Sequence, residues 1–224
     1  MEVLGTAAPD IVGIVFLAGV VSMFVGISTP EYSGLDREIW GMPTKQYLQA
    51  IHANRRPWRW ASAWIVAATV LNVLGFGLLS VLLRDVGGHL LGEAAQLVFL
   101  VGALLWIVVM AFRMGVEPIA AEALARAETV PDWFEPVQAW AMRLSLIYMV
   151  LGYVATAIVG WGLLQTAMLP AWLGWLSLGL GIGGALSLIF TIPRYADFEF
   201  SVAFIPLWLH VIPLILGITL LVQP

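Results

Sequence analysis

Six long apolar stretches dominate the hydropathy pattern of this chain. They cover about 11–28, 60–83, 94–112, 142–164, 170–192 and 203–222. Each approaches the roughly 20 residues that a helix needs to cross a hydrocarbon layer ~30 Å thick. The stretches are continuously apolar and lack the alternation of a membrane β-barrel strand. The pattern predicts an all-α polytopic membrane protein, with six transmembrane helices in one domain over residues 1–224.

Basic residues are distributed unequally between the connections that join these spans. Nine of the ten Lys and Arg residues lie in or beside segments 29–59, 113–141 and 193–202, and only Arg84 lies on the other side. Cytoplasmic loops of membrane proteins collect Lys and Arg. We therefore expect these three connections inside and both termini outside, in the inner (cytoplasmic) membrane of a bacterium.

Composition excludes several kinds of chemistry. The chain is 61% hydrophobic and 11% charged, with a mean hydropathy of +0.95, which is outside the range of ordinary soluble domains. Its lack of cysteine excludes disulfides, thiolate catalysis and Fe–S clusters. No basic tract indicates nucleic acid as a partner, and no motif predicts a catalytic or metal site. The sequence thus indicates a membrane location far more clearly than an activity.

The first inside segment, 29–59, contains a predicted short helix. Thr44 is expected to cap a helix over 45–54, and Tyr47, Leu48 and Ile51 share one face of it.

A basic, tryptophan-containing cluster follows that helix and leads into the second span. Basic side chains with Trp at a cytoplasmic membrane surface suit anionic lipid headgroups, at about 1 kcal/mol per cation. Membrane lipids are therefore the predicted partner. Topological anchoring alone is the alternative. The predicted headgroup residues are Arg55, Arg56, Arg59 and Trp58.

The second inside segment, 113–141, is predicted to contain another helix. Arg113 with Glu117, and Glu122 with Arg126, are pairs of opposite charge four residues apart in an Ala-rich run. A cluster of acids in this segment is compatible with a divalent cation, but a solvated helix face is the favoured interpretation. These acids are Glu117, Glu122, Glu128, Asp132 and Glu135.

Rows of small residues indicate where helices approach one another closely in lipid. The fifth span contains two such rows, one through Gly179 and Gly183 and another over 177, 181 and 185, and the fourth span contains Gly152. We predict Gly179, Gly183 and Gly152 as helix-packing positions. A contact with another membrane subunit, or with a second copy of the chain, is the alternative.

His210 is the best candidate for chemistry inside the hydrocarbon layer, where ionisable groups are costly. It lies between Pro206 and Pro213, each of which frees a backbone carbonyl. Met149 and Tyr148 are predicted at a similar depth. A haem, a chlorin or a carotenoid is therefore a possible cofactor, held by His210, Met149 and Tyr148. The alternative is a histidine that only satisfies its neighbours in the core.

The chain resembles a broad set of functionally uncharacterised bacterial integral membrane proteins with six helices and similar length. The resemblance rests on three segments: 49–52 with Trp58 and Arg59, then 74–79 in the second span, and 169–175 at the start of the fifth. It implies six helices and carries no activity, cofactor or site residue.

Three functional hypotheses follow from these observations. The first is a non-enzymatic membrane subunit that packs against other membrane proteins, or binds lipid or pigment between its helices. The second is a small transporter or proton-coupled permease, for which His210 and the prolines around it are the support. The third is a membrane enzyme that modifies lipids at the inner face.

Overall fold

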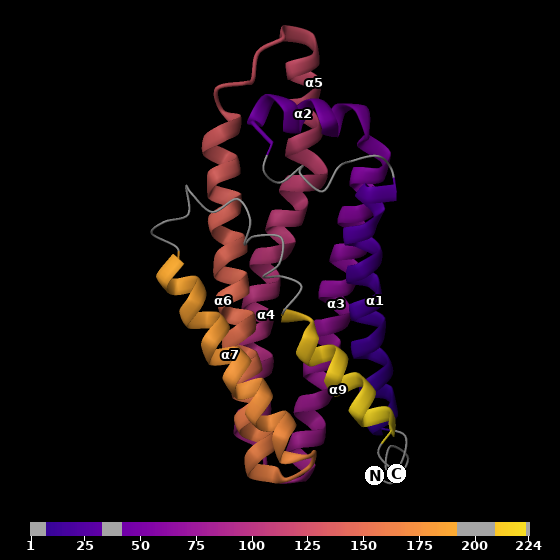
Figure 1. Cartoon of the computed structure of the whole chain (residues 1–224), viewed down its shortest axis with the longest axis vertical. Coiled ribbons are helices and arrows are strands. Elements are labelled where there is room, and N and C mark those ends of the chain that lie inside the picture. The colour runs from indigo at the N-terminus through magenta and orange to yellow at the C-terminus, as the bar shows by residue number, and fades with distance from the viewer. Residues whose placement is uncertain (1–7, 33–41, 192–208, 223–224) are drawn as a thin grey trace.

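The computed structural model describes residues 8–32, 42–191 and 209–222, and every regular element in these ranges is a helix (Figure 1). This confirms the all-α prediction for the described part of the chain. The elements are α1 (Ala8–Tyr32), α2 (Thr44–Ala53), α3 (Arg55–Asp85), α4 (His89–Ala111), the π-helix η2 (Phe112–Val116), α5 (Glu117–Ala127), α6 (Phe134–Thr166), α7 (Ala171–Thr191) and α9 (Val211–Val222).

Five helical segments in the described ranges are long and apolar enough to cross a membrane. They lie in α1, α3, the continuous α4–η2–α5 helix, α6 and α7. At 1.5 Å per residue, the 12 residues of α9 extend only about 18 Å. The predicted inside segment 193–202 and the first part of the predicted sixth span, 203–208, lie outside the described residues. A polytopic membrane protein is therefore confirmed, and the sixth crossing stays a prediction.

The long helices pack in an up-and-down order. Helix α3 lies against α1 and α4, α6 lies against α4 and α7, and α9 packs on α1 (Figure 1). Aromatic rings fill the centre: Phe76 stacks on Phe99 at 4.3 Å between centroids and meets the edge of Phe16 at 5.7 Å. Offset and edge-on ring contacts of this kind are favourable beyond the area that they bury.

The helix that starts as α4 continues well beyond a bilayer. Its 39 residues from His89 to Ala127 extend about 58 Å, whereas α4 alone, at about 35 Å, already exceeds a ~30 Å layer. We therefore take α4 as the membrane-spanning part and place η2 and α5 beyond the layer. Together with α2 they cover one end of the bundle (Figure 1). This end is the inner one in the predicted orientation.

The structure does not end this helix at 112, as the hydropathy pattern predicts, but continues it through the π-helical turn. Pro118, at the start of α5, has no N–H to donate to the carbonyl four residues earlier. A wider i→i+5 turn directly before it accommodates that gap in the hydrogen-bond ladder. The continuation carries Arg113 and Glu117 on one rigid element.

The short helix in the first inside segment is confirmed as α2, with Tyr47, Leu48 and Ile51 buried. The predicted Thr44 cap is wrong, because Thr44 is the first helical residue and Pro43 holds the cap position without a side-chain bond. Helix α3 begins at 55 rather than 60, so the basic cluster forms its first turns. A proline at 57 is tolerated there because the first N–H groups of a helix have no intrahelical acceptor.

Glycine positions show which small-residue row packs inside the chain. A Cβ added at Gly152 in α6 would meet the side chain of Leu209, two residues before α9, at 2.7 Å, so the chain approaches α6 closely at this glycine. The prediction for Gly179 and Gly183 is wrong as an internal contact, since a Cβ at either would meet nothing within 4 Å. The row that contains Gly181 packs inside the chain instead, against the backbone of Ala157. Positions two residues apart lie on opposite sides of a helix, so Gly181 faces the bundle where Gly179 and Gly183 do not.

Candidate functional site

One end of the bundle, the inner end in the predicted orientation, is closed by an aromatic and aliphatic cluster between α2, α3, α5 and α6. Trp58 is fully buried in it and is the largest of the fully buried side chains of the described residues. The apolar face of α2, with Tyr47, Leu48 and Ile51, forms part of this cluster. The buried members are Tyr47, Leu48, Ile51, Trp58, Phe112, Ala120, Ala121, Leu124, Phe134 and Ala141.

A carboxylate lies inside this cluster and joins three elements. The hydroxyl of Tyr47 donates to Oε1 of Glu117 at 2.7 Å, and Nε1 of Trp58 donates to Oε2 at 2.9 Å. The same indole N–H lies 3.2 Å from the carbonyl oxygen of Arg113. Glu117 is only 3% exposed. Both of its oxygens therefore accept a hydrogen bond from a residue more than fifty positions away in the chain.

A cation lies next to this carboxylate. The Arg113 guanidinium lies 4.3 Å above the centre of the Trp58 ring, a cation–π contact, and the residue is 5% exposed. The Tyr47 ring meets the same indole edge-on at 5.8 Å. Because Arg113 and Glu117 carry opposite charges one turn apart in a region shielded from water, each reduces the cost of burying the other.

Burial sets the protonation behaviour of this group. Removal from water raises the pKa of Glu117 to about 7, although the Arg113 charge and the hydrogen bonds from Tyr47 and Trp58 act to lower it. Burial, and then the nearby Glu117 carboxylate, hold the pKa of Tyr47 well above its usual range. Glu117 is therefore a carboxyl group that changes charge near neutral pH.

Two expectations from the sequence are corrected here. Trp58 is wrong as a lipid-headgroup residue, because it is fully buried and bonded to Glu117. Glu117 is wrong as part of a solvated face, because α2 folds over it. Two features of the sequence could have indicated this buried site. Arg113 and Glu117 form a pair of opposite charge beside a proline, and the apolar face of the predicted 45–54 helix had no predicted packing partner.

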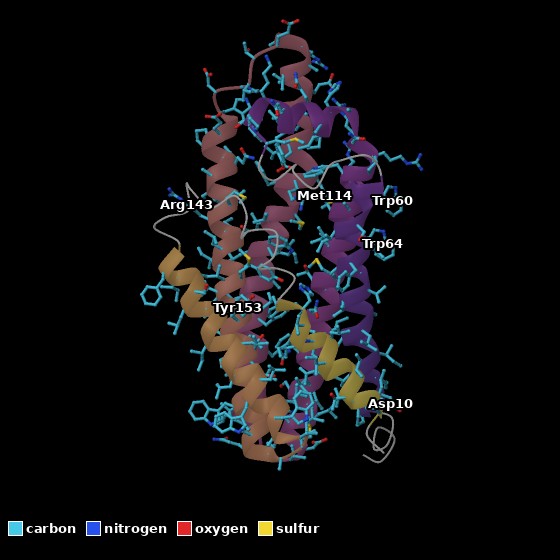
Figure 2. The ribbon with its side chains drawn as sticks, viewed as in Figure 1. Asp10, Trp60, Trp64, Met114, Arg143 and Tyr153 are labelled. Atoms are coloured by element: carbon cyan, nitrogen blue, oxygen red, sulfur yellow. The ribbon has the colours of Figure 1, made fainter. Side chains whose placement is uncertain are left out.

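A depression that is open to the surroundings lies at the start of α3, next to the π-helical turn. It has a volume of about 620 Å³. Figure 2 shows Trp60 and Met114 at the same height of the bundle, above Trp64. Trp60 and Trp64 are both exposed, 55% and 38%. The lining residues are Arg55, Arg56, Arg59, Trp60, Ala63 and Met114.

The three arginines of the depression differ in their partners. Arg55 forms an ion pair with Glu122, and its Nη2 lies 3.0 Å from Nδ1 of His52. Arg56 and Arg59 are exposed, and neither forms an ion pair with a residue of the described ranges. The structure thus brings the three predicted arginines to one depression, where two of them have no ion pair with a residue that the structure describes.

The residues predicted to hold a cofactor are all buried in the bundle. The Tyr148 ring stacks on Trp106 at 4.9 Å and contacts Phe99 edge-on at 6.5 Å, so its ring contacts lie with α4 and not with α9. Met149 belongs to a hydrophobic cluster that also contains Leu209. His210 is 4% exposed, next to the start of α9. A shared ligand for the predicted residues stays a prediction.

Comparison with protein-family models, with curated proteins and with solved structures finds no match to this chain.

Proposed function

We propose that this chain is a non-enzymatic integral membrane protein that binds anionic phospholipid headgroups at its inner end. The observation that carries this is the depression at the start of α3, where Arg56 and Arg59 stand beside exposed Trp60 without an acidic partner in the described ranges. The proposal includes six crossings, both termini outside, and a bacterial inner membrane.

The orientation of the bundle supports a cytoplasmic position for the depression. Nine of the ten basic residues belong to this side of the predicted topology. Helix α1 begins and α9 ends at the opposite end of the bundle, which fits an even number of crossings (Figure 1). The cytoplasmic leaflet carries anionic lipids and attracts cations next to membrane spans.

The chemistry of the lining residues fits a phosphodiester with its acyl chains. A guanidinium can donate two parallel N–H groups to phosphate oxygens, which a lysine ammonium cannot match. An exposed indole favours the headgroup level, and Ala63 and Met114 offer apolar surface toward the layer. At about 1 kcal/mol per cation, Arg56 and Arg59 together give an anionic over a zwitterionic lipid a preference of roughly 30-fold.

The test is a comparison of two lipids with the intact protein in nonionic detergent. We expect soluble short-chain phosphatidylglycerol to bind roughly 30-fold more tightly than the matching phosphatidylcholine. Arg56→Gln and Arg59→Gln should each reduce this preference about fivefold.

Arg84→Gln is the matched control for those two variants. It removes one exposed arginine at the other end of the bundle, where Arg84 is paired with Glu93 at 2.8 Å, and should leave the preference unchanged. Equal binding of the two lipids, or an equal loss in all three variants, would contradict the proposal.

A second candidate function is a contact with another membrane protein through α7. Gly179 and Gly183 are exposed, and a Cβ at either would enter open space, so this small-residue row faces outward. Such rows allow close helix approach in lipid. The transporter and the lipid-modifying enzyme stay predictions from the sequence alone.

A further inference from the structure

The buried Glu117–Arg113 pair and the basic depression are formed by neighbouring residues of the same helices. Arg113 precedes Met114 in the π-helical turn, and Met114 lines the depression. Trp58, which contacts both members of the pair, lies between Arg56 and Arg59 in the sequence of α3. The pair and the proposed lipid site therefore share the same two backbone segments.

The net charge of the Glu117–Arg113 pair depends on one proton. When Glu117 is ionised, its negative charge offsets that of Arg113. When it is protonated, the Arg113 charge remains and the site gains one positive charge. The burial that places the pKa of Glu117 at about 7 makes this change accessible at physiological pH.

Hydrogen-bond chemistry indicates where the proton is held. Trp58 Nε1 can only donate, so Oε2 of Glu117 must remain its acceptor. A tyrosine hydroxyl both donates and accepts, so the Tyr47 oxygen can accept the new O–H from Oε1. The proton taken from solvent therefore goes to Oε1, and the link between α3 and α5 is kept.

Few groups of the described residues face Glu117. From α2 it faces Tyr47, from η2 Arg113, and from α3 the indole of Trp58. The α6 residues of this cluster, Phe134, Val137 and Ala141, are apolar. Nearer the surface lie the Arg55–Glu122 ion pair and His52, which is bonded to Arg55.

We infer that headgroup binding in the depression is linked to protonation of Glu117, and that the site holds anionic lipid more tightly when this carboxyl group is neutral. The inference rests on the proposed lipid function and specifies its regulation. A unit charge added roughly 10 Å from a bound phosphate at a partly hydrated surface changes affinity about three- to tenfold. Linkage is reciprocal, so bound anionic lipid raises the pKa of Glu117.

The experiment measures short-chain phosphatidylglycerol binding to the intact protein at about pH 6 and about pH 8, values on either side of the Glu117 titration. The phosphodiester keeps its single negative charge over this range. Every protein carries His52→Gln, so that the imidazole beside Arg55 cannot contribute a response. The variants are Glu117→Gln and Tyr47→Phe. The control is Glu135→Gln, which removes an exposed acid at the same end.

We expect binding about three- to tenfold tighter at the lower pH in the parent and in Glu135→Gln. Glu117→Gln should bind alike at both values, near the affinity of the parent at low pH. Tyr47→Phe removes a hydrogen bond that lowers the pKa of Glu117, so the midpoint of its response should move to higher pH.

The possible failures are distinguishable. Anionic lipid that binds better than phosphatidylcholine, but equally at both pH values, would overturn the proton linkage and leave the lipid function standing. A response that persists in Glu117→Gln would do the same. If Glu117→Gln does not fold, an unmoved midpoint in Tyr47→Phe would overturn the inference. No preference for phosphatidylglycerol at either pH would overturn the proposed function itself.

Discussion

The docking of α2 onto the bundle should weaken as the pH rises from about 5 to about 8, because α2 helps to keep Glu117 out of water. The docked state raises the pKa of Glu117 from an ordinary 4.5 to about 7. At a pH between these two pKa values, Glu117 is deprotonated when α2 is detached and protonated when α2 is docked. Stability of docking is therefore full below about 4.5, falls as pH rises through this window, and levels off above about 7.

The size of the effect of pH on α2 docking follows from the difference between the two pKa values of Glu117. Raising the pKa of Glu117 from 4.5 to about 7 corresponds to about 3 kcal/mol, or up to roughly 300-fold in the docking equilibrium. This is an upper limit, because Glu117 remains near Arg113 and Trp58 after α2 leaves and so regains only part of its hydration.

Hydrogen exchange of peptides from α2 measures docking directly, in the intact protein in nonionic detergent. Rates are divided at each pH by those of an unstructured reference peptide, and peptides from α7, which has no charged residue, serve as the internal control. Protection of α2 should fall with rising pH, and in Glu117→Gln it should be flat. Protection that rises with pH, or a fall of equal size in Glu117→Gln, would refute the reasoning.

Three further outcomes follow from the packing. Trp58→Ala should lower the free energy of unfolding by about 3–5 kcal/mol, whereas Trp60→Ala, at an exposed position, should change it by less than about 1 kcal/mol, as compared by unfolding in detergent. Gly181→Leu should destabilise the bundle in the same assay, because its side chain would enter the Ala157 backbone. Gly179→Leu with Gly183→Leu should leave the monomer stable. If α7 contacts a partner, the same double variant should abolish that association in size-exclusion chromatography. Unchanged association would count against the contact.

The sequence contained enough information for the broad fold. Hydropathy alone identifies the long helices, since a run of about 20 apolar residues is typical of a membrane-spanning helix. The spacing of Tyr47, Leu48 and Ile51 places them on one face of a short helix, and this face is the buried one in α2. These are local signals, and the structure confirms both.

The site depended on contacts that no local signal encodes. Glu117 is buried because α2 folds back over it, and the Tyr47–Glu117 bond joins residues 70 positions apart. In α7 two small-residue rows overlap, through Gly179 and through Gly181, and periodicity cannot say which one faces the bundle. The tertiary arrangement decides both, so the arginines were predictable as a cluster and the acid behind them was not.

Photo-crosslinking with an anionic lipid is the most direct test of lipid binding at the inner end. A phosphatidylglycerol analogue with a photoreactive group near its headgroup would be incorporated into membranes that contain the protein, and the labelled peptides mapped. Labelling should concentrate at Trp60, Ala63 and Met114, and should fall in a chain that carries Arg56→Gln and Arg59→Gln. Labelling spread evenly along the bundle, or centred on the Arg84 end, would contradict the account.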